Sequence, residues 1–242
     1  MSRWVMPTRA RNTDRREDAL SRERIVAAAV ELLDAAGEGG LTFRALSAHL
    51  KTGPGAIYWH VANKGELLGA ATDAVLAGAL APGAADQTPE QAIREIALGL
   101  FDAIDEHAWL GGQMSRLASQ SATLRIFERL GRQIQALGVP GEAQFNAASA
   151  VLNYILGVAG QNAANARTQA PGTNRTDLLG AESAIWSRLD KAEYPFLHAV
   201  AAQLRDHDDR EQFLAGIDLI LAGVKRARPG DGRDWRDGPP SR

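Results

Sequence analysis

The sequence has no cysteine among its 242 residues, and aromatic side chains make up only 6% of it. Without thiols the chain has no disulfide framework, no thiolate metal ligand and no cysteine nucleophile. Long apolar runs are missing as well. The longest, VLNYILGVAG and FLAGIDLILAGV, are shorter than a membrane span and contain Asn153 and Asp218. The N-terminal residues MSRWVMPTRARNTDRR hold no apolar core of a secretory signal. We therefore expect a cytoplasmic protein without a membrane partner.

Motifs of catalytic chemistry are also missing. The chain contains no Gly-rich phosphate loop, no G-x-S-x-G elbow and no H-E-x-x-H pair. Its carboxylate-rich stretches at 102–106 and 206–209 fall at expected helix ends, where acidic residues serve as caps or solvated faces. His107, His198 and His207 are scattered and lack the spacing of metal ligands. We predict a protein that is not an enzyme and that has no cofactor and no metal site.

Alternating β-branched runs bounded by turns are nearly absent, whereas helical periodicity is found throughout the chain. Ser21 is placed to cap a first helix that stops at Gly37. Thr42 is placed to cap a short second helix. Pro54 suits the first turn of a brief third helix that ends around Val61. The fold class predicted is all-α.

The fourth helix and the later ones follow the same pattern. Asn63 opens the fourth helix, and Glu66 three residues on forms a pair that resembles a capping box. Loops are expected at 81–89 and 168–176. Further helical patterns lie near 90–107, 109–119, 122–137, 142–166, 176–189, 193–206 and 209–226. The predicted domains are a basic arm (1–20), a small helical head (21–66), a larger helical body (67–226) and a non-periodic tail (227–242).

Charge is distributed unevenly along the chain. The net charge of the whole sequence is −2, yet residues 1–16 carry five arginines against Asp14 alone, a net charge of +4. A basic arm on an acidic body is typical of a chain that meets DNA at one end only. The alternative is a solvated tail without a partner, and the composition leaves both interpretations open.

The stretch GPGAIYWHVANK at 53–64 places three bulky side chains in succession. Consecutive large residues cover most of a helix circumference, so some of them must face something other than the core. Two short helices joined by a Gly-containing turn fit a helix-turn-helix, whose second helix enters the DNA major groove. We expect Ile57 to point inward, Tyr58 and His60 to reach phosphates, and Trp59 to pack or contact the backbone. The small residues at 53–56 permit close approach to the bases.

The segment LTFRALSAHLKTGPGAIYWHVANKGELL (41–68) resembles the DNA-binding domain of the TetR family of bacterial transcriptional repressors. The Leu-Thr start, the string IYWHV and the following Asn-Lys pair carry the resemblance. It implies a sequence-specific regulator, with Lys64 on a phosphate at a helix start. The DNA-binding residues expected are Thr42, Arg44, Lys51, Thr52, Gly53, Pro54, Gly55, Ala56, Tyr58, Trp59, His60 and Lys64.

One departure from the family lies in the turn, where Lys51 replaces the usual glycine. A left-handed conformation there costs lysine on the order of 1 kcal/mol relative to glycine, and contact with DNA would offset that cost. The base-reading positions are also small. Specificity would then rest on Thr52, Tyr58, the arginine-rich arm in a minor groove and DNA shape.

The resemblance further implies a homodimer on a (pseudo)palindromic operator, because one helix-turn-helix makes too few contacts. A stripe of small and amide side chains marks a candidate dimer seam, and an apolar face in the last helix continues it; both helices also fit an ordinary core. The seam residues are Asn146, Ala150, Asn153, Gly157, Gly160, Ala164, Phe213, Ile217, Ile220 and Val224.

The resemblance also implies a small-molecule effector that enters the body and releases DNA. Candidate lining residues, each equally consistent with the core, are Trp109, Gln113, Met114, Phe127, Leu130 and Tyr154. Tetracycline-sensing members of the family carry a drug-contacting histidine in the region that corresponds to 61–106, and this sequence has none there. The resemblance therefore argues against tetracycline–magnesium as the effector. The alternative function is an architectural protein that binds DNA without sequence preference and has no effector, because few side chains in the head are suited to reading bases.

Overall fold

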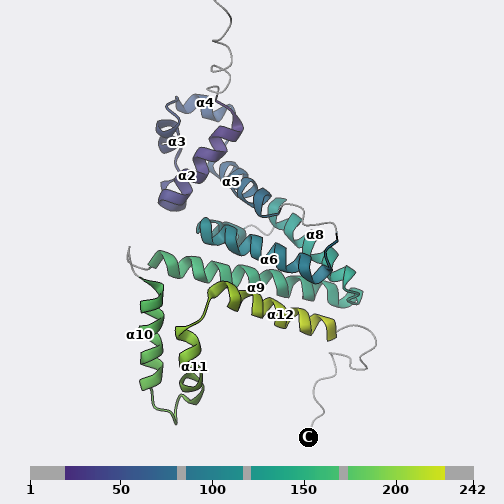
Figure 1. Ribbon diagram of the computed structural model, residues 1–242. Helices are drawn as coiled ribbons and strands as arrows, with labels where there is room; N and C mark the ends of the chain where they lie inside the picture. Colours follow the sequence, from purple (N-terminus) through teal and green to yellow (C-terminus); the bar gives the residue numbers. More distant parts are fainter. Residues whose placement is uncertain (1–19, 81–85, 117–120, 169–173, 227–242) are drawn as a thin grey trace, which may run out of the picture. The chain divides into compact units, whose positions relative to one another are not determined.

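The computed structural model describes residues 20–80, 86–116, 121–168 and 174–226. These residues form eleven helices, α2 to α12, and no strand (Figure 1). The predicted all-α fold is therefore confirmed. The chain divides into two compact units after Ala74, which we call the head and the body. Nearly all of the predicted arm, and the whole of the predicted tail, lie outside the described residues.

Two helices of the head begin at the residues predicted to cap them. Their side chains accept hydrogen bonds from backbone N–H groups three residues on, Ser21 from Arg24 (3.3 Å) and Thr42 from Ala45 (3.0 Å). The head helices are α2 (Arg22–Gly40), α3 (Phe43–His49), α4 (Pro54–Tyr58) and α5 (Lys64–Ala79), and the last of these runs into the body.

Helices α2 and α4 of the head each differ from the sequence prediction in one respect. Gly37 adopts φ 63°, which breaks the helical geometry inside α2 rather than ending it. The second difference is the length of α4, which ends at Tyr58 rather than near Val61. The carbonyl of Ile57 accepts bonds from both the His60 and Val61 N–H groups (2.9 and 3.0 Å), and this tighter turn closes the helix early.

The fourth helix begins where predicted. The Glu66 N–H donates to the Asn63 side chain at 2.9 Å, so Asn63 is its cap. The returning bond differs from an ideal capping box, because the Glu66 carboxylate accepts from the Ala62 N–H (2.8 Å). Side chains of the head therefore accept hydrogen bonds from the N–H groups of Ala62 and Glu66, just before and within the first turn of α5.

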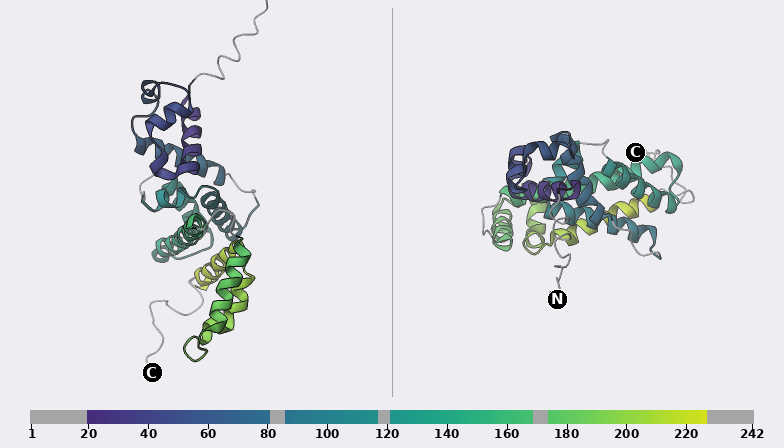
Figure 2. Two further views of the ribbon diagram at one scale, coloured as in Figure 1. Left: turned by 90° about the vertical axis from the view of Figure 1, so that its left-hand side faces the viewer. Right: turned by 90° about the horizontal axis from the view of Figure 1, so that it is seen from above.

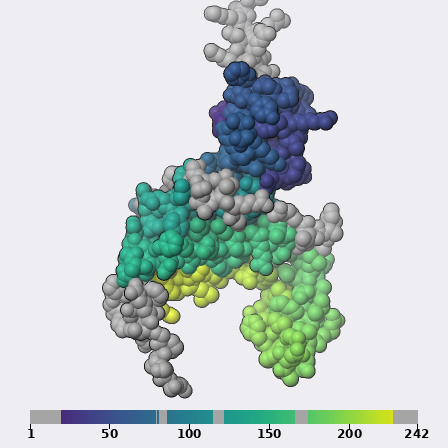
Figure 3. All heavy atoms as spheres, turned by 180° about the vertical axis from the view of Figure 1, so that it is seen from behind, coloured from purple at the N-terminus to yellow at the C-terminus, as the bar shows by residue number. Residues whose placement is uncertain are grey.

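The body consists of the seven helices from α6 onward, and all seven match predicted segments. They are α6 (Pro89–Glu106), α7 (Leu110–Arg116), α8 (Ser121–Ala136), α9 (Gly141–Thr168), α10 (Arg175–Arg188), α11 (Pro195–Arg205) and α12 (Asp209–Arg226). The long α9 packs against α6, α8 and α12, and α9 and α12 run side by side (Figure 2). α10 and α11 pair with each other as a hairpin, which forms one block of surface in Figure 3.

The core of the body is built from helical apolar stripes. Ile93, Leu100 and Ile104 of α6 are fully buried, as are Ile134 of α8 and Ile155 of α9. Ion pairs between side chains, including Arg94–Asp218 (2.7 Å) and Lys225–Glu90 (2.8 Å), connect α6 and α12 at the surface. None of the described helices is long and apolar enough to cross a membrane.

Candidate nucleic-acid interface

The turn between α3 and α4 is tight and is closed by backbone hydrogen bonds. The N–H of Lys51 donates to the Ala48 carbonyl (3.2 Å), and the N–H of Thr52 donates to the Ser47 carbonyl (3.0 Å). Lys51 adopts φ 51°, and no other non-glycine residue of the described chain has a positive φ. Residue 51 is therefore left-handed, the conformation in which lysine is less favourable than glycine, and the two helices form a helix-turn-helix.

One face of α4 anchors the helix to the head. Ile57 is fully buried, in line with its predicted inward orientation, and Leu46 of α3 and Val61 lie in the same core. Of the other four residues of this five-residue helix, Ala56 is half-buried and three are exposed. The core of the head therefore fixes the position of α4 but uses little of its surface.

The two aromatic residues that follow Ile57 point away from this core. Trp59 is 87% exposed and Tyr58 is 54% exposed. The Tyr58 ring stacks on Phe43 with centroids 4.5 Å apart and planes within 7°, so α3 holds the ring of α4 in place. Large exposed aromatic side chains at neighbouring positions indicate a binding surface rather than a fold requirement.

The small residues at the start of α4 are not demanded by the chain itself. Gly53 has φ −81°, which any residue adopts, and a Cβ atom added at Gly53 or Gly55 would meet no heavy atom within 4 Å. Glycine is therefore needed there neither for backbone conformation nor for internal packing. Both residues are exposed, and their small size leaves room for a partner to approach the backbone.

The predicted polar contacts have different environments. Arg44 and Lys51 are exposed. Thr42 is exposed too, but its hydroxyl caps α3. The Lys64 ammonium is half-buried and donates to the Glu38 carbonyl at 2.6 Å. No pattern in the sequence indicated this bond, which ties the start of α5 to the kinked end of α2.

The other predicted positions also lie at this surface. Thr52, Ala56 and His60 are half-buried, and Pro54 is exposed. The structure therefore gathers the twelve predicted DNA-binding residues on the turn, on α4 and on the flanking helix starts. Contact with DNA at each of them stays a prediction.

An ion pair that no sequence pattern predicted connects α2 to the segment that follows α4 and to the start of α5. Arg22 donates to the His60 carbonyl (2.6 Å) and pairs with Glu66 at 2.8 Å. The N–H of Ala62 and the Arg22 guanidinium together lower the pKa of Glu66 below its ordinary value. The carboxylate thus stays ionised and holds α2, the end of α4 and the start of α5 together.

The residues predicted to line an effector pocket are mostly packed in the body. Trp109, Gln113, Met114 and Leu130 are buried. Phe127 is half-buried and meets Phe145 edge-on with centroids 5.9 Å apart. Tyr154 is half-buried and donates to the Phe213 carbonyl at 3.2 Å. Burial also raises the pKa of the Tyr154 hydroxyl.

Tyr154 alone of these six lines a cavity of about 840 Å³ in the body. The cavity lies among α9, the α10–α11 hairpin and α12, and the sequence pattern of any one helix does not reveal it. Arg175, Asn162 and His207 contribute polar groups to its wall. The Asn162 amide nitrogen is buried without a hydrogen-bond partner, and Arg175 pairs with Asp209. Among the described residues no group of three or more histidine and acidic side chains is arranged to hold a metal.

The predicted dimer seam divides into two groups. Asn146, Ala150, Asn153, Gly157 and Ala164 are exposed on α9, whereas Gly160 faces α7, where Gly111 approaches its backbone. On α12, Phe213 and Ile217 are fully buried and Val224 is 9% exposed, so these side chains belong to the core of the body. Helical spacing is the same for a face that packs inside the body and for a face that packs against a partner. The sequence pattern therefore could not distinguish the exposed residues from the buried ones. Ile220 is half-buried beside a small apolar groove of about 290 Å³.

A helix-turn-helix head with an exposed recognition surface, joined to a larger all-helical body, defines a DNA-binding regulator. Residues 25–71 match the family described as bacterial regulatory proteins, tetR family, and residues 81–228 match the tetracyclin repressor-like C-terminal domain. The chain belongs to the TetR family, whose members regulate transcription by binding DNA.

Three relatives illustrate the match. The transcriptional regulator SCO7222, a TetR from Streptomyces coelicolor, is 55% identical with a TM-score of 0.79, over 87% of this chain and 100% of that one. An HTH-type transcriptional regulator from Saccharopolyspora erythraea is 28% identical over 96% of this chain and 84% of its own. BioQ, which is known from Mycobacterium smegmatis and was solved with its natural double-stranded DNA operator, is 28% identical with a TM-score of 0.59, over 86% and 99% of the two chains.

Proposed function

We propose that this protein is a repressor that binds a (pseudo)palindromic operator as a homodimer and is released when a small molecule binds in its body. The similarity of residues 81–228 to the C-terminal domain of a repressor supports the direction of regulation. Since bacterial operators lie in the cytoplasm, the function also assigns the protein to that compartment.

The observation that carries the proposal is the surface of α4. Its only fully buried side chain is Ile57, and Gly53 and Gly55 add no side chain at its N-terminal end, although internal packing does not require glycine there. A helix that inserts its N-terminal end into a major groove needs such a slim start, because bases lie at the bottom of the groove. Lys51 and Arg44 on the flanks then reach phosphates, which fix the register.

Dimerisation follows from the size of this surface. One five-residue recognition helix contacts only a few base pairs, and two copies on half-sites one helical turn apart double the contacts. The exposed small residues of α9 would form the seam, since small side chains let two helices approach closely. The buried residues of α12 would support the seam from inside rather than take part in it.

The body cavity supplies a place for an effector. A volume of about 840 Å³ lies within the range of small-molecule sites, roughly 300–1,000 Å³. Its wall combines Tyr154 and apolar residues with the Asn162 amide, whose buried nitrogen lacks a partner. An effector with a hydrogen-bond acceptor would satisfy that nitrogen, because a buried donor without a partner is unfavourable.

The DNA-binding part of the proposal is tested by Arg44→Ala. Arg44 is exposed, so its loss should not unfold the head, and the logarithmic slope of affinity against salt should fall by about 1 per subunit. Fluorescence anisotropy with labelled operator DNA at several salt concentrations measures the slope. Arg132→Ala is the matched control, since Arg132 pairs with Glu128 on the surface of α8 in the body. An unchanged slope for Arg44→Ala would remove Arg44 from the interface.

A further inference from the structure

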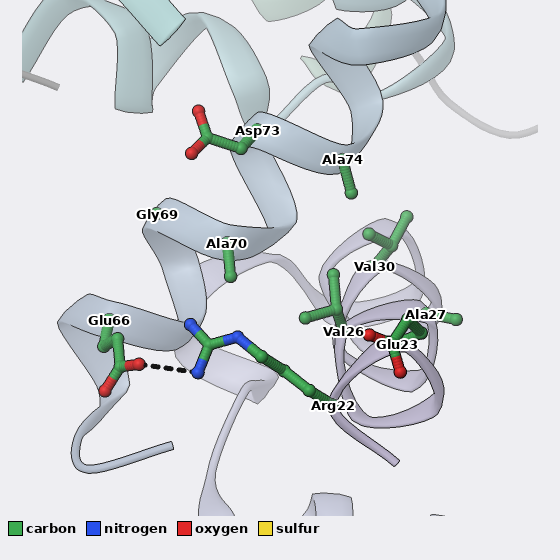
Figure 4. A pocket seen from close by; sticks show the side chains of 10 residues that line it. All are labelled: Arg22, Glu23, Val26, Ala27, Val30, Glu66, Gly69, Ala70, Asp73 and Ala74. Carbon is green, nitrogen blue, oxygen red and sulfur yellow. Dashed lines mark ion pairs between the residues drawn. The ribbon is translucent and has the colours of Figure 1, made fainter. Parts of the chain in front are cut away.

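The head contains a groove that the DNA-binding surface does not explain. It has a volume of about 740 Å³ and runs between α2 and α5 (Figure 4). Every residue of its wall belongs to the head, so it is a property of that unit alone. The lining residues are Arg22, Glu23, Val26, Ala27, Val30, Glu66, Gly69, Ala70, Asp73 and Ala74.

The floor of the groove is apolar and is shaped by small side chains. Val26 and Val30 of α2 face Ala70 and Ala74 of α5 across it, and Gly69 adds no side chain at all (Figure 4). Residues this small cannot fill the space between two helices. A bulky flat side chain would find apolar contacts on both walls.

The rim of the groove is acidic. Glu23, Glu66 and Asp73 supply three carboxylates, and Arg22, which pairs with Glu66 at 2.8 Å, supplies the only cation of the wall. The pKa of Glu23 and that of Glu66 are both lowered, chiefly by backbone N–H groups, so both remain ionised well below neutral pH. An occupant that matches this groove carries a large apolar group with several positive charges beside it.

Residues 1–19, which lie outside the described part of the chain, have that composition. Trp4, Val5 and Met6 are consecutive apolar residues, and the segment carries five arginines against three acidic residues, a net charge of +2. The segment joins the head at Leu20, two residues before Arg22 at the mouth of the groove. Trp4 and Leu20 are sixteen residue steps apart, and a chain of that length can span up to about 50 Å. The groove extends along α2 from Arg22 to Val30, only about 12 Å.

We propose that the N-terminal arm folds back into the groove between α2 and α5, with Trp4 on the apolar floor and arginines on the carboxylates of the rim. The docked arm has its charge neutralised by the head. Phosphates of DNA compete with the rim for the same arginines, so the arm leaves the groove when it engages DNA. The groove thus holds the arm while no DNA is bound.

Because the chain has no cysteine of its own, a single introduced thiol is the only one that a maleimide can label. Ala27→Cys places one thiol in the groove, and its rate of reaction with a maleimide reports how often the groove is open. An attached segment has an effective concentration on the order of 1 mM. A docking Kd of about 0.1 mM would therefore slow labelling about tenfold relative to the same variant without residues 1–19. Ala35→Cys, exposed on α2 but not in the groove wall, should react at one rate in both chains.

Two further measurements on the full-length chain separate the proposal from an effect of truncation. Adding Trp4→Ala to the Ala27→Cys variant should restore most of the fast labelling in the groove, and 1 M salt should restore part of it, since it screens the rim charges. Equal labelling rates with and without residues 1–19 would contradict the proposal. Fast labelling in both chains would mean an empty groove. Slow labelling in both would mean another occupant, and a dependence of the rate on protein concentration would identify that occupant as a second copy of the chain.

Discussion

At the scale of single residues, Tyr58 has two separable tasks. Its ring stacks on Phe43 at 4.5 Å, and its hydroxyl is proposed to contact a phosphate. An aromatic pair contributes roughly 1 kcal/mol to stability, whereas a hydrogen bond to a charged group contributes about 1.5 kcal/mol, or roughly tenfold in affinity.

Tyr58→Phe is therefore expected to keep the melting temperature and weaken DNA binding about tenfold. Tyr58→Ala should lose affinity to a similar or larger extent and also destabilise the protein by about 1 kcal/mol. Thermal unfolding and a DNA titration on both variants measure the two effects. If Tyr58→Phe binds DNA like the native chain, the hydroxyl makes no contact and only the ring matters.

The environment of individual residues is the part of the site that the sequence predicted least well. The outward face of α4 and the inward Ile57 followed from short-range patterns, because a short helix of this kind is specified by a few neighbouring residues. The bond from Lys64 to the Glu38 carbonyl and the bridge from Arg22 to Glu66 join residues 26 and 44 positions apart. No local spacing indicates such partners.

At the scale of elements, glycine at the start of α4 leaves room for DNA but makes the helix less stable than alanine would. Alanine is favoured over glycine in a helix by up to about 1 kcal/mol, and the space beside Gly55 is open. Gly55→Ala should therefore raise the free energy of unfolding slightly while it weakens DNA binding, because the new methyl group lies on the face that enters the groove.

Thermal unfolding together with a DNA titration checks this opposite pair of effects. Gly112→Ala on α7 is the control, since Gly112 is also exposed with open space around it, and it should leave DNA affinity unchanged. A Gly55→Ala variant that binds DNA as tightly as the native chain would place α4 outside the groove.

The joint between α2 and α5 is expected to depend on pH through Glu66. The folded-state pKa of Glu66 lies below its ordinary value of 4.5, because the Ala62 N–H and Arg22 stabilise the carboxylate. A group with a depressed pKa stabilises the fold above its unfolded pKa, and this contribution is lost as the pH falls through the folded pKa.

Glu66→Gln should consequently be less stable than the native chain at pH 7, and the difference should shrink as the pH falls below about 4.5. Melting temperatures between pH 7 and pH 3 measure the difference, with Glu193→Gln as an exposed control. A difference that stays constant across this range would show that ionisation of Glu66 has no part in it.

Elements themselves were largely predictable. Helical periodicity, the caps Ser21 and Thr42 and the opening Asn63 are local signals, and the helices begin near the predicted residues. The cavity beside Tyr154 was not predictable, because it forms where α9, α12 and the α10–α11 hairpin meet. For the same reason Phe213, with its ring 4.6 Å from that of Phe101, looked as suitable for a partner as for the core.

At the scale of the whole molecule, the chain combines a head that reads DNA with a body that contains a cavity. The central claim is that the head distinguishes one DNA sequence from others. A regulator that selects its operator should exceed its non-specific affinity by roughly 10³ or more. An architectural protein that coats DNA depends on phosphate contacts alone, and salt weakens such binding equally on every sequence.

The most direct measurement is a titration of the purified protein against the intergenic DNA upstream of its own gene and against a scrambled copy, at about 150 mM salt. The account predicts binding to the upstream fragment at least about 10³ times tighter than to the scrambled copy, and a smaller preference in Gly55→Ala. Equal and salt-sensitive binding to both fragments, together with no preferred sequence in a selection from random DNA, would contradict the account.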